Sequence, residues 1–275
     1  MKIVDGKSIA NSILARLRRQ VSGMKRKPVL AVVLVGEDKP SEVYVKHKQA
    51  AALSVGIKFL LYKFPAGISQ EQLISKIRGI QNQALDGIIV QLPLPAKFDK
   101  KKVLNELNPD IDVDCLSWVS LGKLVIHDNN LVPPSPGAVL EILKYHKINL
   151  KGKHVVLVGQ GDLIGKPLTN ILIHMPVTLT TCNKETQNLG KITRDADILI
   201  TGVGRYQLIK ASMIKQGAVV IDAGVSFKAG KMYGDIDFGP VSKKAALVTP
   251  TPGGVGPITV AKLLENTVLI AKNRK

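Results

Sequence analysis

Residues 154–167 read His-Val-Val-Leu-Val-Gly-Gln-Gly-Asp-Leu-Ile-Gly-Lys-Pro, an apolar run that ends in a loop with three glycines. The run is typical of a buried parallel strand, and glycines permit a tight turn into a helix. At such a turn, Gly159, Gly161 and Gly165 allow a pyrophosphate to approach the amides of the helix N-terminus. The spacing is one residue longer than the usual dinucleotide fingerprint, so a purely structural turn is the alternative interpretation.

The same alternation of short apolar strands and helices extends over most of the chain. It predicts an α/β fold with parallel, doubly wound sheets. Ser41 is expected to cap the predicted helix 41–55, and Gly56 to end it. The predicted strands are 28–35, 58–64, 87–92, 154–158, 177–181, 197–202 and 218–222; the helices are 41–55, 69–81, 100–107, 137–145, a helix ending near 174, and 260–271.

A segment rich in proline and aspartate, residues 108–136, interrupts this rhythm. We interpret it as the boundary between two α/β domains. The first domain is predicted at residues 1–134, completed by the C-terminal segment 251–275. The second, residues 135–250, is predicted to be a Rossmann-like dinucleotide-binding domain.

Composition narrows the classes of function. No apolar run approaches the roughly 20 residues that a membrane span needs, and the first residues lack the apolar stretch of a signal peptide. Cys115 and Cys182 are the two cysteines, so we expect no disulfide framework and a reducing, cytoplasmic setting. We therefore predict no membrane partner.

The chain is basic, with a formal net charge of +18 over 275 residues. A nucleic-acid-binding protein is the rival function that this charge suggests. The basic residues are scattered, however, and neither aromatic stacking positions nor a DNA-binding motif accompanies them. We expect a solvated basic surface that attracts an anionic small substrate or cofactor, and no nucleic-acid partner.

Residues 249–259 read Thr-Pro-Thr-Pro-Gly-Gly-Val-Gly-Pro-Ile-Thr and lead directly into the last predicted helix. We call residues 249–257 the glycine-proline loop. Proline fixes φ, glycine allows a ligand to approach bare backbone, and helix N-terminal amides favour anionic or carbonyl-rich ligands. The loop is thus a candidate binding element, with a tight interdomain turn as the alternative.

Polar residues of the first domain form a second candidate site. Tyr44 and Lys48 are four residues apart, so they share one face of a predicted helix. Gln91 lies at the carboxyl end of a predicted strand, the end where α/β sheets bind ligands. A lysine among apolar neighbours can act as a base because burial lowers its pKa. Asp112 and Asp114 are either ligand-binding residues or turn formers.

Four features of the chain occur together: Tyr44 with Lys48, the Val-Gln-Leu-Pro-Leu-Pro run at 90–95, the Asp-Val-Asp loop at 112–114 and the glycine-proline loop. In this combination they resemble the bifunctional methylenetetrahydrofolate dehydrogenase/methenyltetrahydrofolate cyclohydrolase family. The resemblance runs from residue 4 to residue 268. It implies two domains with a cleft between them, and a homodimer. It also implies oxidation of 5,10-methylenetetrahydrofolate to the methenyl form, followed by hydrolysis to 10-formyltetrahydrofolate.

The resemblance also implies roles for individual residues. Lys48 matches the family's catalytic lysine, Gln91 would hydrogen-bond to it, Tyr44 would stack on the folate, and Asp114 would hold the donor edge of the pterin. The cofactor is predicted to be NADP, with NAD as the alternative, and no metal is expected. Further predicted contacts are Gly254 and Pro257 for the folate, and Ser135, Gly159, Gln160, Gly161, Lys184 and Val225 for the cofactor.

The chain departs from the family pattern at several positions. Gln160 and Gly161 replace an arginine and a serine that hold the 2′-phosphate of NADP, and Asn183-Lys184 replaces a His-Ser pair. Residues 133–136 read Pro-Pro-Ser-Pro for Pro-Cys-Thr-Pro, and Cys115 replaces a glycine. Either Lys184 holds a 2′-phosphate or Glu185 holds a ribose. Two alternatives therefore remain: a cyclohydrolase with weak dehydrogenase activity, and an unrelated Rossmann dehydrogenase acting on a small polar acid.

Overall fold

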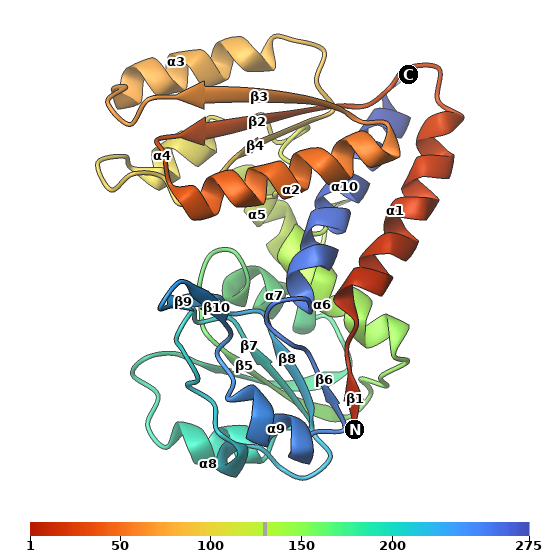
Figure 1. Cartoon of the computed structure of the whole chain (residues 1–275), viewed down its shortest axis with the longest axis vertical. Coiled ribbons are helices and arrows are strands. Elements are labelled where there is room, and N and C mark those ends of the chain that lie inside the picture. Colours follow the sequence, from red (N-terminus) through yellow and green to blue (C-terminus); the bar gives the residue numbers. More distant parts are fainter. Residues whose placement is uncertain (129–130, 275) are drawn as a thin grey trace. The chain divides into compact units, whose positions relative to one another are not determined.

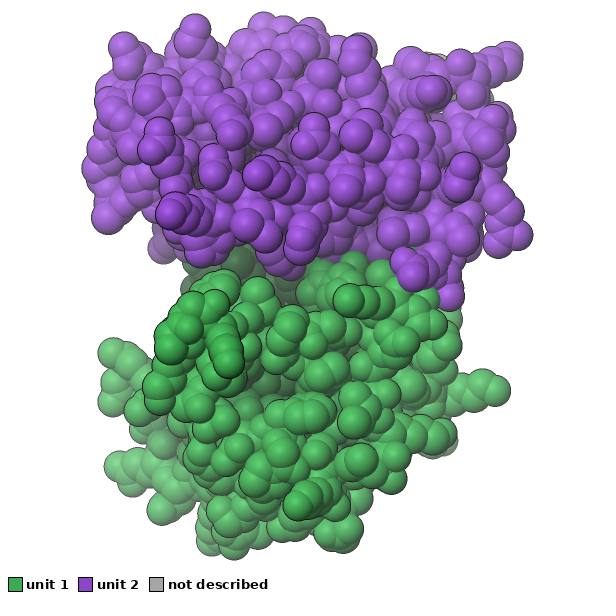
Figure 2. All heavy atoms as spheres, viewed as in Figure 1, with its two compact units in different colours: residues 1–10, 135–259 green, residues 11–134, 260–275 purple. Residues whose placement is uncertain are grey.

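The computed structural model describes residues 1–128 and 131–274, and the chain divides into two compact units. Unit 1 comprises residues 1–10 and 135–259, and unit 2 comprises residues 11–134 and 260–275 (Figure 2). Residues 129 and 130, which belong to the predicted boundary segment, lie outside the described residues. Both units are built from parallel strands and helices, as the sequence predicts.

The units differ from the predicted boundaries in two segments, residues 1–10 and 251–259, which belong to unit 1. Strand β1 (Lys2–Ile3) pairs in parallel with β11 (Leu247–Val248), which places the N-terminus in the unit 1 sheet. The amide of Gly6 also donates a hydrogen bond to the carbonyl of Gly253, at 3.0 Å. Main-chain hydrogen bonds between residues more than 240 positions apart in the sequence thus place both segments in unit 1.

The unit 1 sheet has six strands in the order β1-β11-β8-β7-β5-β6, all parallel (Figure 1). The chain runs outward from β5 to β6 and then crosses back to β7, so the strand order reverses between β5 and β7. Such a reversal leaves a crevice at the carboxyl ends of the strands, where open α/β sheets bind ligands. The inner strands are β5 (Lys153–Val158), β7 (Ile198–Thr201), β8 (Val219–Asp222) and β11, and β6 (Val177–Cys182) is an edge strand.

Continuous β-branched and leucine side chains make the inner strands buried on both faces. Val156, Leu199 and Val220 are fully buried in one core cluster. A short antiparallel hairpin follows β8. The remaining elements of unit 1 are α6 (Pro134–Tyr145), which begins at its boundary, α7 (Gly165–Leu172), α8 (Leu189–Arg194), a short helix Ala211–Met213, hairpin strands β9 (Ser226–Lys228) and β10 (Lys231–Tyr233), and α9 (Phe238–Lys244).

Unit 2 contains a three-stranded parallel sheet in the order β3-β2-β4. Its central strand is buried along nearly its whole length. Helices α2 and α3 lie on opposite faces of this sheet (Figure 1), as right-handed crossovers require. The strands are β2 (Val29–Val35), β3 (Lys58–Phe64) and β4 (Gly87–Val90); the helices are α2 (Lys39–Val55), α3 (Gln70–Gln81), α4 (Lys100–Asn105) and α5 (Trp118–Val125).

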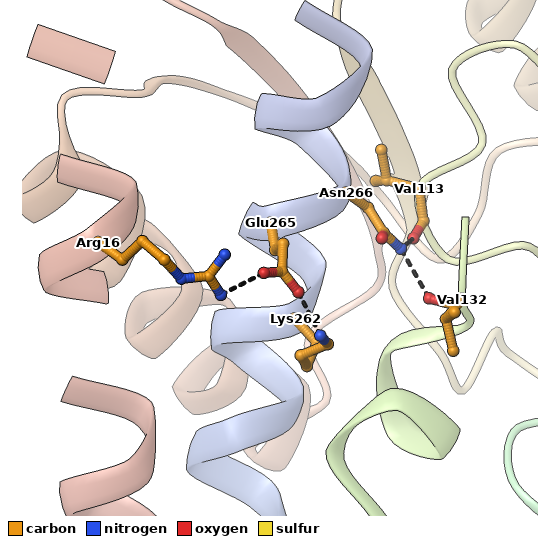
Figure 3. A network of polar contacts seen from close by, with 6 residues as sticks. All are labelled: Arg16, Val113, Val132, Lys262, Glu265 and Asn266. Atoms are coloured by element: carbon orange, nitrogen blue, oxygen red, sulfur yellow. Dashed lines mark hydrogen bonds and ion pairs between the residues drawn. The ribbon is translucent and has the colours of Figure 1, made fainter. Parts of the chain in front are cut away.

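Two long helices complete the fold, α1 (Gly6–Ser22) and α10 (Val255–Asn273). Helix α1 buries Ile13, Leu17 and Val21, which recur every four residues and form one apolar face. Arg16 of α1 pairs with Glu265 of α10 (Figure 3). No helix was predicted over α1, because its basic residues were interpreted as a charged surface.

Three predicted helix starts are wrong, and one of them is that of α6, which begins at Pro134 and not at residue 137. Asp38 caps α2 by accepting the amide of Ser41 at 2.9 Å, so Ser41 lies in the first turn and is not the N-cap. Gly56 ends the helix as predicted, with a φ of 88°. The last helix begins at Val255 within the glycine-proline loop, five residues before the predicted start. None of the described helices combines the length and apolar character that crossing a membrane requires.

Candidate active site

Lys48 is the central residue of the candidate catalytic site in unit 2. It lies on α2 with only 6% of its surface exposed. Its Nζ donates a hydrogen bond to Oε1 of Gln91, at 2.9 Å. Gln91 follows β4, and its own Nε2 donates to the carbonyl of Leu92 at 2.7 Å. Because the side-chain nitrogen of Gln91 donates to Leu92, the side-chain oxygen is the atom that faces Lys48.

Tyr44 lies one helical turn before Lys48 on α2. The lysine Nζ is 5.5 Å from the centroid of the tyrosine ring, within the range of a cation–π contact. Burial raises the pKa of the Tyr44 phenol, and the carboxylate of Asp114 raises it further. Tyr44 is therefore a neutral phenol at physiological pH, suited to stacking and hydrogen bonding.

Lys48 and Asp114 carry opposite charges, and each shifts the pKa of the other. Burial lowers the pKa of Lys48, and the negative charge of Asp114 offsets part of that shift. For Asp114, burial raises the pKa, Lys48 lowers it, and Asp112 raises it. The structure thus brings Tyr44, Lys48, Gln91 and Asp114 into one cluster, in which a lysine with a lowered pKa can hold or release a proton.

The two aspartates of the 112–114 loop have different surroundings. Asp112 is fully buried and accepts the amide of Ser117 at 2.8 Å, so it shapes the turn. Asp114 interacts electrostatically with Lys48. Cys115, which follows it, has a φ of 57°, a conformation that glycine adopts with least strain. A glycine at position 115 would adopt this φ without strain, so a glycine suits the turn.

Asn266 of α10 holds the backbone beside Asp114. Its side chain is 4% exposed, and its Nδ2 donates to the carbonyls of Val113 at 2.9 Å and Val132 at 2.8 Å. Figure 3 shows the amide between these two chain segments. The family resemblance extends to Asn266-Thr-Val268 but gave Asn266 no role, because its partners are more than 130 residues away along the chain.

In unit 1, the glycine loop joins β5 to α7. Gly159 has a φ of 110°, and a Cβ placed there would lie 2.7 Å from the carbonyl oxygen of Gly202. A Cβ at Gly165 would lie 2.1 Å from the oxygen of Gly159, so both positions require glycine. A Cβ at Gly161 would meet nothing within 4 Å, so the loop is open at this residue.

The N-terminus of α7 has no side-chain cap; the amide of Lys166 donates to the carbonyl of Gly161 at 3.0 Å, and Pro167 has no N–H. Backbone that is open at Gly161, beside the first residue of an uncapped helix, is a feature that suits a pyrophosphate group. These residues therefore fit a dinucleotide, at the edge of the sheet where the strand order reverses.

Side chains at the end of β6 surround Gln160. Its Nε2 donates to Oγ1 of Thr181 at 3.2 Å, and it accepts from Nδ2 of Asn183 at 3.3 Å. Lys184 has a side chain that is 91% exposed, and its Nζ is 3.5 Å from Glu185. An ion pair this exposed contributes little, so both side chains are available to a ligand.

The other predicted contacts are dispersed over unit 1. Ser135 lies in the first turn of α6, and Val225 lies after β8 with 48% of its surface exposed. Pro257 is in the first turn of α10. A Cβ at Gly254 would lie 2.5 Å from the carbonyl oxygen of Pro250, so packing within the loop alone requires a glycine there.

Sequence models of two domains match this chain. Residues 4–114 match the catalytic domain of tetrahydrofolate dehydrogenase/cyclohydrolase, and residues 133–275 match its NAD(P)-binding domain. The chain belongs to the tetrahydrofolate dehydrogenase/cyclohydrolase family. This confirms the predicted resemblance over nearly the full length of the sequence.

Relatives and solved structures agree with the family. The bifunctional protein FolD of Campylobacter hominis is 40% identical over 279 residues, which covers 100% of this chain and 98% of that protein. The crystal structure of the bifunctional enzyme FolD from Campylobacter jejuni has a TM-score of 0.97, with 37% identity and full coverage of both chains. A Trypanosoma brucei FolD complexed with NADP and inhibitor has a TM-score of 0.94 and 34% identity, covering 98% and 97% of the two chains.

More distant structures share the fold alone. Shikimate dehydrogenase from Aquifex aeolicus has a TM-score of 0.57 and 14% identity, covering 92% of this chain and 99% of that one. Membership in the tetrahydrofolate dehydrogenase/cyclohydrolase family confirms the two-domain α/β fold with a Rossmann-like domain. It also confirms an enzyme with methylenetetrahydrofolate dehydrogenase and methenyltetrahydrofolate cyclohydrolase activities, a tetrahydrofolate substrate and NADP or NAD as cofactor. The alternatives of a weakened dehydrogenase or an unrelated one are not favoured.

Proposed function

We propose that the cluster around Lys48 performs the cyclohydrolase step and that the loops of unit 1 hold the cofactor for the dehydrogenase step. The observation that carries this proposal is the buried hydrogen bond between Lys48 and Gln91, beside the charge of Asp114. A buried lysine with a lowered pKa and a specific charge partner is a candidate for proton transfer.

Folate binding follows from the polar groups of unit 2. The Asp114 carboxylate accepts hydrogen bonds from the paired N–H donors of the pterin, since two oxygens match two donors. The Tyr44 ring presents an apolar face on which a flat ligand stacks. Gly254 and Pro257 of unit 1 remain predicted contacts of the folate, through backbone and ring surface.

The oxidation step needs no general base. Nitrogen lone pairs on both sides of the one-carbon bridge stabilise the cation that forms when the bridge loses a hydride. NADP, when held by the residues of unit 1 proposed below, would supply the hydride acceptor. The residues of the chain contribute by orienting substrate and cofactor, because correct placement of two reactants removes a large part of a barrier.

Hydrolysis needs an activated water. Water oxygen bonds to the methenyl carbon, the bond from that carbon to N5 breaks, and the formyl group stays on N10. The Lys48 amine takes one proton from the water and gives it to N5 as the bond to N5 breaks. The second water proton leaves the hydroxyl as the formyl C=O forms and passes to solvent, so hydrolysis of the methenyl cation releases one proton. The Gln91 oxygen accepts an N–H from Lys48 and so directs the lysine lone pair away from the glutamine.

We assign the cofactor to Gly159, Gln160, Gly161, Lys184, Ser135 and Val225 of unit 1. The glycines fit the pyrophosphate, as described above. Lys184 is the cation near the end of β6, where nucleotide-binding sheets hold the ribose of the cofactor. A lysine neutralises a 2′-phosphate as a point charge and cannot clamp it with two parallel bonds, as an arginine does. The protein therefore uses NADP, with weaker discrimination against NAD than an arginine would give.

Changing Lys184 to Glu is expected to shift the preference toward NAD, because it replaces attraction for a 2′-phosphate with repulsion. The preference is the ratio of kcat/KM for NADP to kcat/KM for NAD, measured in both proteins. Lys191→Glu is the matched control, since it makes the same charge change on α8 of the same unit. A ratio that moves no further in Lys184→Glu than in the control would remove Lys184 from the cofactor site.

We further propose a homodimer, supported by the edge of the unit 2 sheet. Strand β3 is at that edge, and its residues 59–62 (Phe-Leu-Leu-Tyr) are only half-buried. An edge strand with apolar side chains is suited to association with a second copy. Light scattering on the purified protein is expected to give twice the chain mass of 29.7 kDa, and a mass of one chain at micromolar concentration would contradict the dimer.

The two free cysteines support a cytoplasmic location. Cys115 and Cys182 are both buried and unpaired with each other. Reduced thiols of this kind are typical of proteins in reducing compartments.

The proposed function as a whole is tested by supplying 5,10-methylenetetrahydrofolate with NADP or NAD in separate reactions. Absorbance of the reduced cofactor reports the oxidation, and absorbance of the methenyl product reports its formation and hydrolysis. We expect reduced cofactor with NADP and a smaller yield with NAD. No reduced cofactor with either nucleotide would contradict the proposal.

A further inference from the structure

Two carboxylates without an assigned role are buried at the carboxyl edge of the unit 1 sheet. Asp222 ends β8, and Asp235 follows β10; their exposed fractions are 1% and 0%. Burial raises the pKa of both, that of Asp222 to about 6, with the neighbouring charge of Asp235 adding to the shift of Asp222. Placing two carboxylates side by side in a protein interior is costly, and hydrogen bonds from neighbouring groups offset that cost.

Asp235 binds both ends of the loop that follows β7. Its Oδ2 accepts the amide of Val203, and its Oδ1 accepts the amide of Arg205, each at 2.7 Å. Gly204 between them has a φ of 75°, so the backbone curls around the carboxylate. Strand β7 borders the point where the strand order reverses, so this loop lies beside the nucleotide crevice.

Asp222 holds the next loop and the segment that carries Asp235. Its Oδ1 accepts the amide of Gly224 at 3.0 Å and the hydroxyl of Thr201 at 3.1 Å. Its Oδ2 accepts the amide of Ile236 at 3.0 Å. The loop that begins at Ala223 also contains Val225, one of the predicted cofactor contacts.

Two glycines make room for this arrangement. A Cβ at Gly224 would lie 2.1 Å from the carboxyl group of Asp235, and a Cβ at Gly234 would lie 1.9 Å from Oδ2 of Asp222. The loop that Asp235 holds also packs on the glycine loop, since a Cβ at Gly159 would reach within 2.7 Å of Gly202. Asp235 is thus connected through residues 202–205 to the predicted pyrophosphate site.

We propose that Asp235, supported by Asp222, is a positioning residue for the nicotinamide cofactor, because it fixes residues 203–205 against the glycine loop at Gly159. The proposal rests on the assignment of the cofactor to this unit. It predicts that a change at Asp235 weakens cofactor binding and leaves the chemistry of unit 2 intact. A carboxylate needed only for folding would affect both activities alike.

The test compares Asp235→Asn with Asp197→Asn. Asparagine keeps the shape of Asp235, but its Nδ2 cannot accept an amide, so one end of the 203–205 loop loses its partner. Asp197 is a matched control at the opposite edge of the same sheet, where it accepts the amide of His154 at 2.9 Å. Asp235→Asn is expected to raise the KM for NADP about tenfold while methenyltetrahydrofolate hydrolysis, assayed without cofactor, stays within twofold. Asp197→Asn is expected to leave the KM for NADP unchanged.

Equal KM values for the two variants, or a parallel fall in hydrolysis in Asp235→Asn, would overturn the proposal. An unchanged KM in Asp235→Asn would also follow if the cofactor site lay elsewhere, so Gly161→Asp is assayed beside it: an unchanged KM in both variants would reject the cofactor assignment itself. Hydrogen exchange on the unchanged protein gives a measurement that does not depend on variant folding. The amides of Val203 and Arg205 are expected to be protected without cofactor, and exchange as fast as an open loop would overturn the proposal.

Discussion

Lys48→Ala is expected to lose methenyltetrahydrofolate hydrolysis by about 10²–10⁴-fold, the usual contribution of a general acid or base, while the oxidation step persists. The expectation rests on the buried contact between Lys48 and Gln91 and on the burial that lowers the lysine pKa. Lys48→Arg is expected to lose hydrolysis as well, because a guanidinium keeps the charge but does not release a proton near neutral pH. Hydrolysis is measured by the decay of methenyltetrahydrofolate absorbance.

Lys46→Ala is the matched control, because Lys46 is on the same helix, two residues earlier, with its side chain exposed. It removes one positive charge from α2 without touching the cluster, so hydrolysis should remain normal. Ordinary hydrolysis in Lys48→Ala would remove Lys48 from the mechanism.

Asp114→Ala is expected to raise the dissociation constant for reduced folate about tenfold or more, since a hydrogen bond to a charged group contributes roughly 1.5–3 kcal/mol. The variant also removes the negative charge that raises the pKa of Lys48, so that pKa is expected to fall further. A titration of the protein with a reduced folate, followed by fluorescence or calorimetry, measures the change in affinity.

Asp110→Ala serves as the comparison for Asp114, because Asp110 lies in the same segment and is exposed. Its loss should leave folate affinity as it is. If Asp114→Ala binds folate as tightly as this control, residues 112–114 form only a turn, and the substrate-binding role of Asp114 is wrong.

Local sequence signals predicted much of the fold. Strand β2 was recognisable because its seven residues are all aliphatic, and the end of α2 because Gly56 adopts a positive φ that favours glycine. The start of α2 was predicted two residues too late, although the residues that could cap this helix lie close together in the sequence. Asp38 and Ser41 are both good capping residues, and only the structure shows that Asp38 accepts the amide.

Contacts between residues far apart in the sequence could not be predicted from local sequence patterns. The pairing of β1 with β11 depends on main-chain hydrogen bonds between the two ends of the chain. Asn266 and Asp235 act through backbone groups of other segments, and a single asparagine or aspartate has no periodicity that marks such a partner. Lys48 and Gln91 were candidates because of their helical spacing and strand-end position, and a family resemblance gave their roles. The hydrogen bond between them needed the fold.

The most direct test of the account is one reaction: Lys48→Ala with 5,10-methylenetetrahydrofolate and NADP, followed at the absorbance of reduced cofactor and of methenyltetrahydrofolate together. The account predicts that reduced cofactor and methenyltetrahydrofolate rise in equal amounts and that the methenyl product persists. In the unchanged protein, the same reduced cofactor should appear with much less methenyl product. A variant that forms reduced cofactor but clears the methenyl product at the unchanged protein's rate would contradict the central claim that Lys48 carries the hydrolysis.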